Sequence, residues 1–174
     1  MNDRTLICKI QQGQKELLNE IAEKYYDDIY RFCCYLTGQS QDAYDLAQET
    51  FLRFIRYVDR YRYRNLKGYL LTIARNVCMD YLRQKKGEAL TDAPEEEEKA
   101  QKTSRDEISA LVERQFFWEE LLKLPQMQRE ALILYYYNGL KIREIAAMTG
   151  VSGSTVKSRL RQGTEKLKKG MEVD

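Results

Sequence analysis

The side chains with the clearest chemistry lie between positions 141 and 169, and that chemistry is hydrogen bonding to duplex nucleic acid. This stretch carries eight Lys and Arg residues against two Glu residues, a net charge of +6. Hydroxyl, amide and basic side chains read base edges in the major groove and hold backbone phosphates. The candidates for base contact recur at helical spacing and are Ser154, Thr155, Lys157, Ser158, Arg161 and Gln162. The candidates for phosphate contact are Lys141 and Arg159.

A second stretch, residues 56–64, is rich in alternating tyrosine and arginine, and we call it the Tyr/Arg loop. Tyrosine rings stack on unpaired bases and guanidinium groups neutralise phosphates, so this composition is typical of proteins that hold single-stranded nucleic acid. The candidate residues are Tyr57, Arg60, Tyr61, Arg62, Tyr63 and Arg64. A segment with strict Tyr/Arg alternation can also form an edge strand. The neighbouring sequence predicts no partner strand, however, and a loop is therefore predicted. In an alternative interpretation the tyrosines pack on their own domain and only the arginines face water.

A helix-turn-helix must position the first set of residues. Apolar residues at 142, 145 and 146, and then at 156, 160 and 167, predict two helices that each bury one face. Gly150 suits the left-handed residue that ends a helix. Ser152 is a good N-cap, whose hydroxyl accepts from the amide of Ser154 or Thr155. The second helix then presents its N-terminal turns to the major groove. A solvated helical hairpin with a basic face is the alternative.

Longer amphipathic helices must position the second set. Apolar spacing predicts helices over residues 14–36, 40–58 and 66–81, and allows a short helix at 3–12. Gly38 is expected to end the first of the three, and Ser40 to cap the second. Three such helices can close one small core.

The chain changes character after residue 84. Gly87, Pro94 and the run Glu95–Glu98 occur with almost no large apolar side chain, which indicates a linker. Two further helices are predicted, over 106–122 with apolar residues at 108, 111, 112, 116 and 122, and from Pro125 to Gly139. The expected fold class is all-α. Its parts are an N-terminal domain at 1–86, a linker at 87–105 and a C-terminal domain at 106–174.

The composition argues against an enzyme. The 174 residues include no histidine, no CxxC pair and no glycine-rich phosphate loop. The usual general base and a Cys/His zinc site are therefore missing, and no catalytic, cofactor-binding or metal-binding residue is expected. The cysteines at 8, 33, 34 and 78 are expected to be reduced, mostly buried thiols, with a redox switch at Cys33-Cys34 as an alternative.

Nothing in the sequence predicts a membrane span or export. No apolar run approaches the roughly 18 residues that a membrane span needs. The apolar part of the N-terminus is too short for a secretory signal. The chain is therefore expected to be cytoplasmic, without direct membrane insertion.

The net charge of +2 is small, but basic and acidic residues are strongly segregated along the chain. Residues 53–86 carry ten basic side chains against two acidic ones, whereas residues 87–107 carry three against eight. Phosphates attract the basic blocks and repel the acidic block between them. The pattern predicts two nucleic-acid contacts joined by a connector that makes none.

In this order, the parts resemble the extracytoplasmic-function sigma factors, the small two-domain initiation factors of bacterial RNA polymerase. The similarity covers nearly the whole chain. Residues 45–51 are similar to the family's polymerase-binding motif, and residues 69–76 and 80–83 to its promoter-melting helix. The match continues through Leu124-Pro125, Arg129, residues 144–146 and residues 155–160.

The chain departs from the family pattern at three places. Tyr69 stands where Trp is usual, which keeps an aromatic ring. Lys141 replaces the usual Ser or Thr and removes a cap of about 1 kcal/mol. After Leu160 the family tends to read x-Arg-Ala-Arg, whereas this chain reads Arg161-Gln162-Gly163-Thr164. Gly163 is expected to loosen that helix by about 1 kcal/mol relative to Ala.

The resemblance implies a division of labour. The N-terminal domain would dock on core RNA polymerase and hold the melted minus-ten strand, while the C-terminal domain reads the minus-thirty-five duplex. The implied polymerase contacts are Asp45, Leu46, Gln48, Glu49 and Phe51. The implied minus-ten contacts are those of the Tyr/Arg loop together with Tyr69, Arg75, Asn76 and Arg83. An anti-sigma factor is a further implied partner, and a small-molecule substrate is not. The acidic linker could line a basic channel of polymerase, or it could be a passive tether.

Two other classes of protein remain alternatives. A conventional helix-turn-helix regulator would bind DNA without polymerase, but it needs a dimerisation helix for two half-sites, and no heptad run extends beyond the short last helix. A pure protein-binding module with a degenerate DNA face is the third. A gel shift with and without core polymerase separates all three.

Overall fold

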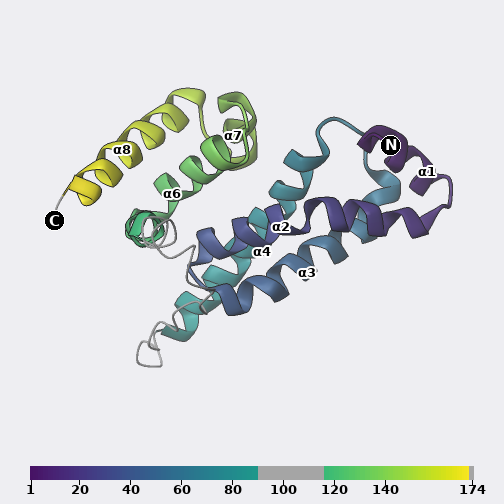
Figure 1. The fold of residues 1–174 in the computed structure, drawn as a ribbon, viewed down its shortest axis with the longest axis horizontal. Helices are drawn as coiled ribbons and strands as arrows, with labels where there is room; N and C mark the ends of the chain where they lie inside the picture. Colours follow the sequence, from purple (N-terminus) through teal and green to yellow (C-terminus); the bar gives the residue numbers. More distant parts are fainter. Residues whose placement is uncertain (90–115, 173–174) are drawn as a thin grey trace, which may run out of the picture. The chain divides into compact units, whose positions relative to one another are not determined.

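The computed structural model describes residues 1–89 and 116–172. These residues form helices and no strand, and they fall into two compact units, one on each side of the undescribed segment (Figure 1). The prediction of an all-α fold with two helical domains is therefore confirmed. The predicted residue boundaries of the linker stay a prediction, since most of it lies outside the described residues.

The N-terminal unit is built on three long helices, with a short helix at one end (Figure 1). Its elements are α1 (Asp3–Gln11), η1 (Lys15–Leu17), α2 (Leu18–Thr37), α3 (Ser40–Tyr57), η2 (Val58–Arg60) and α4 (Leu66–Ala89). Ile21, Phe32 and Phe54 are almost wholly buried where α2, α3 and α4 pack together. The predicted three-helix core is confirmed.

The ends of these helices follow local rules, with one correction. Gly38 is left-handed at φ 76° and ends α2, as predicted. Ser40, however, is not the N-cap of α3. The amide of Ala43 already donates to the Gln39 carbonyl at 3.2 Å, so Gln39 occupies that position. The third long helix, α4, continues beyond the predicted apolar stripe at 66–81 and ends at Ala89.

The C-terminal unit contains a helix over residues 116–122, α6 (Gln126–Leu132), the π-helix η4 (Ile133–Tyr137), α7 (Ile142–Thr149) and α8 (Gly153–Glu172). Phe116 and Leu122, predicted to face the core, are each 38% exposed, whereas Leu121 is buried. The prediction was wrong at these two positions, because Leu121 and Leu124 are the residues buried before Pro125. The other three positions of the predicted stripe, 108, 111 and 112, lie outside the described residues.

Gly163 has a packing role that its sequence context did not indicate. It is buried in α8, where a Cβ would lie 3.1 Å from Leu132 Cδ1 and 3.3 Å from Gln128 Cβ. Such distances are tighter than ordinary van der Waals contact. The missing side chain therefore lets α8 pack closely against α6.

The cysteines are all free thiols. Cys33 and Cys78 are buried, Cys34 is half-buried and Cys8 is exposed. The Cys33 thiol is hydrogen-bonded to the Cys78 thiol across α2 and α4, and this contact together with burial raises the pKa of Cys33. The partner of Cys33 in the core is thus Cys78, which the sequence alternative of a Cys33-Cys34 switch did not include. No helix in the described ranges combines the length and the apolarity needed to cross a membrane.

Candidate nucleic-acid interface

The predicted helix-turn-helix is formed by α7 and α8. Gly150 is left-handed at φ 72°, and its amide donates to the Ala146 carbonyl at 2.9 Å. The Ser152 hydroxyl accepts from the Thr155 amide at 3.2 Å, as predicted. At the start of α7, the Lys141 amide donates to the Glu144 carboxylate at 3.1 Å, which supplies half of a capping box and offsets the missing Ser or Thr cap.

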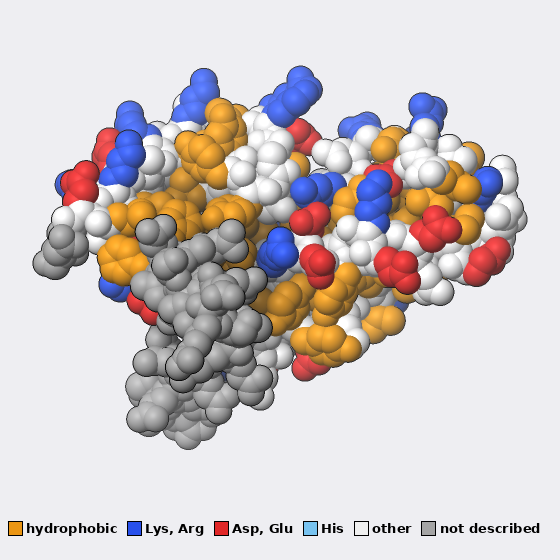
Figure 2. All heavy atoms as spheres, viewed as in Figure 1, with side chains coloured by type: hydrophobic (Ala, Val, Ile, Leu, Met, Phe, Trp, Pro, Cys, Tyr) orange, Lys and Arg blue, Asp and Glu red, His pale blue; other side chains and the backbone are white. Residues whose placement is uncertain are grey.

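Five of the predicted minus-thirty-five residues of α8 share one outer face, and Thr155 and Arg159 lie at its edge. The five are Ser154, Lys157, Ser158, Arg161 and Gln162. Val156 and Leu160 are buried on the opposite face. Ser154, Lys157, Arg161 and Gln162 are exposed, whereas Thr155, Ser158 and Arg159 are half-buried. Lys and Arg side chains project along the outer edge of this unit in Figure 2. Lys141 is also exposed, but it comes from the start of α7.

Some polar side chains on or beside that face already form hydrogen bonds within the protein, and others do not. The hydroxyls of Ser154 and Thr155 each lie 3.0 Å from the Ser152 hydroxyl, so they belong to the cap of α8. Buried Gln128 donates to the Gln162 side-chain oxygen at 3.3 Å. Lys157 and Arg161 are both exposed, and their long basic side chains suit contact with a base edge.

The prediction of a loop holds for only part of the Tyr/Arg loop. Residues 61–64 are irregular, whereas Tyr57 is the last residue of α3 and residues 58–60 form η2. Arg60, Arg62 and Arg64 are exposed, as are the rings of Tyr57 and Tyr63. These five side chains fit the prediction of rings and guanidinium groups displayed together.

Tyr61 differs from these side chains, because it is half-buried and packs within the protein. Its ring stacks on Tyr69 of α4, with 4.4 Å between centroids, and its hydroxyl accepts from the Arg64 amide at 3.3 Å. Burial raises the pKa of Tyr61. The ring of Tyr63 meets Tyr61 edge-on. Tyr61 and Tyr69 therefore form a supporting layer, and Tyr57 and Tyr63 are the rings free to stack on a base.

Three of the predicted minus-ten residues lie along one face of α4. Tyr69, Asn76 and Arg83 are spaced seven residues apart, which is two helical turns. Asn76 is exposed and carries both a donor and an acceptor, so it can read a base edge. Arg83 is exposed but ion-paired with Asp80, while Arg75 is half-buried one position off this face.

The predicted polymerase contacts are divided between surface and core. Asp45 and Gln48 are exposed and Glu49 is half-exposed, so these three share an outer face of α3. Leu46 and Phe51, by contrast, are each only 8% exposed and pack inside the N-terminal unit.

Three exposed apolar residues of α3 were missed by the sequence analysis. Tyr44, Leu52 and Ile55 are 51%, 56% and 45% exposed. With Gln48 they follow a spacing of i, i+4, i+8 and i+11, so they form a stripe beside the acidic residues. We call this surface the docking face, and it consists of Tyr44, Asp45, Gln48, Glu49, Leu52 and Ile55. The spacing of its apolar residues could have been identified from the sequence once Phe51 was assigned to the core.

A chain of ion pairs links the docking face to α4. Glu49 accepts from Arg53 at 3.0 Å, and Arg53 lies 3.7 Å from Asp80, which also pairs with Arg83. All four side chains are substantially exposed, so each pair contributes little to stability. Glu49 and Arg83 therefore remain available to outside partners.

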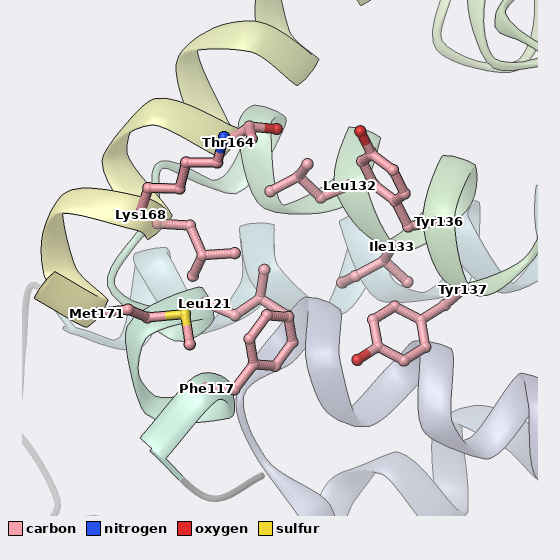
Figure 3. A pocket seen from close by; sticks show the side chains of 10 residues that line it. Phe117, Leu121, Leu132, Ile133, Tyr136, Tyr137, Thr164, Lys168 and Met171 are labelled. Carbon is pink, nitrogen blue, oxygen red and sulfur yellow. The ribbon is translucent and has the colours of Figure 1, made fainter. Parts of the chain in front are cut away.

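The C-terminal unit also carries an apolar groove of about 380 Å³, which the sequence did not indicate. Figure 3 shows side chains from the 116–122 helix, from η4 and from α8 converging on it. The lining residues are Phe117, Leu121, Leu132, Ile133, Tyr136, Tyr137, Thr164, Leu167, Lys168 and Met171.

Comparison with known proteins finds a family match in each of the two units. Sigma-70 region 2 matches residues 21–88, and Sigma-70, region 4 matches residues 117–167. The ECF RNA polymerase sigma factor SigM of Bacillus subtilis (strain 168) is 30% identical over 151 residues, covering 87% of this chain and 93% of SigM. SigW of the same organism is 28% identical over 174 residues, covering 94% of this chain and 93% of SigW.

A solved structure gives the same result. The sigma factor RpoE of Bartonella quintana, in complex with the anti-sigma factor NepR, superposes with a TM-score of 0.73 at 26% identity, covering 90% of this chain and 97% of that one. Matches to both regions, in the right order and over nearly the full length of SigM, disfavour a conventional regulator. The chain belongs to the extracytoplasmic-function sigma factors, which bind core RNA polymerase and direct it to promoters.

Proposed function

We propose that this sigma factor meets promoter DNA through two surfaces of different chemistry. The outer face of α8 reads the minus-thirty-five duplex, and the Tyr/Arg loop with α4 holds the melted minus-ten strand. Of these two surfaces, only the Tyr/Arg loop with α4 combines exposed aromatic rings with arginines, and this difference supports the proposal. Base faces become available for stacking only after the duplex is melted, so rings suit an unpaired strand.

In vitro transcription with core polymerase on a promoter library tests this assignment. Variants of the α8 face are expected to change which upstream elements are used, and variants of the Tyr/Arg loop to change opening at all of them. Both sets of variants changing only the affinity for core polymerase would contradict the proposal.

The docking face of α3 is proposed as the polymerase contact, with the apolar stripe at its centre. Replacing Gln48 and Glu49 together by alanine removes hydrogen-bonding groups from this face and is expected to weaken binding to core polymerase by about 1 kcal/mol or more. Adding Leu52→Ala should weaken it further, because apolar anchors near the centre of an interface carry much of its energy. Competition for core polymerase against the wild-type chain measures both effects.

Asn19 and Glu20 provide the matched control. Both are exposed on α2, and Asn19→Ala with Glu20→Ala removes the same kinds of group outside the docking face. Equal affinities of the control and the Gln48/Glu49 variant for core polymerase would overturn the assignment.

We also propose that an anti-sigma factor holds this chain inactive. RpoE, its relative at 26% identity, was solved in complex with one. The apolar groove is proposed to receive the apolar face of an amphipathic helix of that partner, a common mode of peptide recognition. Charge placed at the groove is expected to release the chain.

Tyr136→Asp tests this, since Tyr136 lines the groove and is 63% exposed, so the variant keeps the core intact. The expected result is that the inhibitor that silences the wild-type chain in vitro no longer silences the variant. Met127→Asp, at a residue 62% exposed and outside the groove lining, is the control. Undiminished inhibition of the Tyr136 variant would exclude the groove as the docking site.

We infer that the chain acts in the cytoplasm beside RNA polymerase and catalyses no reaction itself. Membership of the sigma factor family supports both inferences. Recovery with core polymerase in the cytosolic fraction is the expected result of cell fractionation.

A further inference from the structure

Gln11, the last residue of α1, contacts the main chain around η2 within the Tyr/Arg loop. The Gln11 side-chain amide donates to the main-chain carbonyl of Val58 at 2.9 Å and to that of Tyr61 at 2.7 Å, 47 and 50 residues further along the chain. These carbonyls lie at the start and just past the end of η2. One amide group therefore joins α1 to both ends of η2, the helical turn within the Tyr/Arg loop.

Gln11 is held by a firmly anchored helix. Leu6, Ile7 and Ile10 of α1 are buried in the N-terminal unit. At the other end of α1, Asp3 accepts from Lys24 at 2.7 Å and from the Tyr25 hydroxyl of α2. Burial raises the pKa of Asp3, but these hydrogen bonds lower it more, so the carboxylate stays charged. A side chain projecting from such a helix can fix the position of a loop.

A second contact between the same segments is weaker. Lys15 of η1 lies 2.5 Å from Asp59 of η2, but both side chains are about half exposed or more. Exposed ion pairs contribute little because water screens them and ordering two side chains is unfavourable. Gln11 is exposed as well, but its amide makes two hydrogen bonds, and the one to the carbonyl of buried Val58 is partly buried.

We propose that Gln11 is a positioning residue for the melted strand. By holding the carbonyl of Tyr61 it keeps the Tyr61 ring stacked on Tyr69, and this layer holds Tyr63 where it meets an unpaired base. A loop held in its binding conformation loses less freedom when the strand arrives. This inference rests on the proposed function of the Tyr/Arg loop.

Gln11→Glu is the sharpest test, because it keeps the shape of the side chain but removes both donors and turns a carboxylate toward two carbonyl oxygens. Gln11→Ala removes the donors without adding charge. The control is Gln12→Glu, which places the same charge on the exposed neighbouring residue at the end of α1. Each variant is assembled with core polymerase and tested on a duplex promoter and on a premelted promoter.

Both Gln11 variants are expected to form about tenfold fewer open complexes on the duplex promoter, as the loss of two hydrogen bonds implies. They are also expected to discriminate less between cognate and altered minus-ten strands on the premelted promoter. Their affinity for core polymerase should equal that of the Gln12 control. A merely structural role would instead lower polymerase affinity in step with opening, and that result would overturn the inference.

Tyr63→Ala in the same assay separates this inference from the function on which it rests. A defective Tyr63 variant beside normal Gln11 variants would overturn the role of Gln11 and leave the loop's function standing. A Tyr63 variant that opens the duplex promoter normally would overturn the function of the loop itself, and with it the role of Gln11.

Discussion

Replacing Tyr57 and Tyr63 together by alanine is expected to reduce open-complex formation on a duplex promoter at least tenfold. Stacking contributes roughly 1 to 3 kcal/mol per base, and these two rings are 47% and 39% exposed. Melting removes each base from its stack, and the protein must provide new partners to offset that. Permanganate footprinting of unpaired thymines measures the extent of opening, and a premelted template should rescue much of the loss.

Tyr61 provides the control for this experiment. Tyr61→Phe keeps the ring that stacks on Tyr69 and removes only the hydroxyl that accepts from the Arg64 amide. It is expected to open the promoter nearly as well as wild type. If the double variant at 57 and 63 opens the duplex as fast and as fully as wild type, the Tyr/Arg loop is not the melting site.

Replacing Lys157 by alanine is expected to weaken binding to the cognate minus-thirty-five element by about 1 to 3 kcal/mol and to relax base choice at one position. Lys157 is exposed on the outer face of α8, opposite buried Val156. The measurement is a binding titration of the holoenzyme against a set of upstream elements that each differ at one base pair.

Arg159 and Lys166 make the comparison specific. Arg159→Ala, at the candidate phosphate contact, is expected to weaken binding to all sequences alike and to reduce its salt dependence. Lys166→Ala removes an exposed basic side chain nine residues further along α8. It should have the smallest effect on which upstream DNA sequences are bound. A uniform loss for Lys157→Ala would identify Lys157 as another phosphate contact and contradict base reading.

Signals confined to one or two helical turns were predictable from the sequence. Gly38 and Gly150 end their helices in the left-handed conformation, and Ser152 accepts the amide of Thr155 as expected. These features depend on a residue's own backbone preference and on neighbours within four positions. The two-unit helical fold and the shared face of the α8 residues follow from the same local periodicity.

Side chains whose role depends on distant partners were not predictable in this way. The apolar periodicity of residues 40–58 places Leu46 and Phe51 on the inner face of the helix, where the structure buries both. The family motif named the same two residues as polymerase contacts, and the exposed stripe of Tyr44, Leu52 and Ile55 was therefore missed. In the same way, alternation in the Tyr/Arg loop does not show that Tyr61 packs on Tyr69.

The sequence by itself determined the helices, their caps, the helix-turn-helix and the two basic surfaces, because hydrophobic spacing and charge act locally. Tertiary structure alone decided which of those residues reach a partner. Gln11 meets the Tyr61 carbonyl 50 residues away, and Gly163 lies where a Cβ would be crowded against α6. Such contacts depend on how whole helices pack, since close packing fixes the position of every side chain between them.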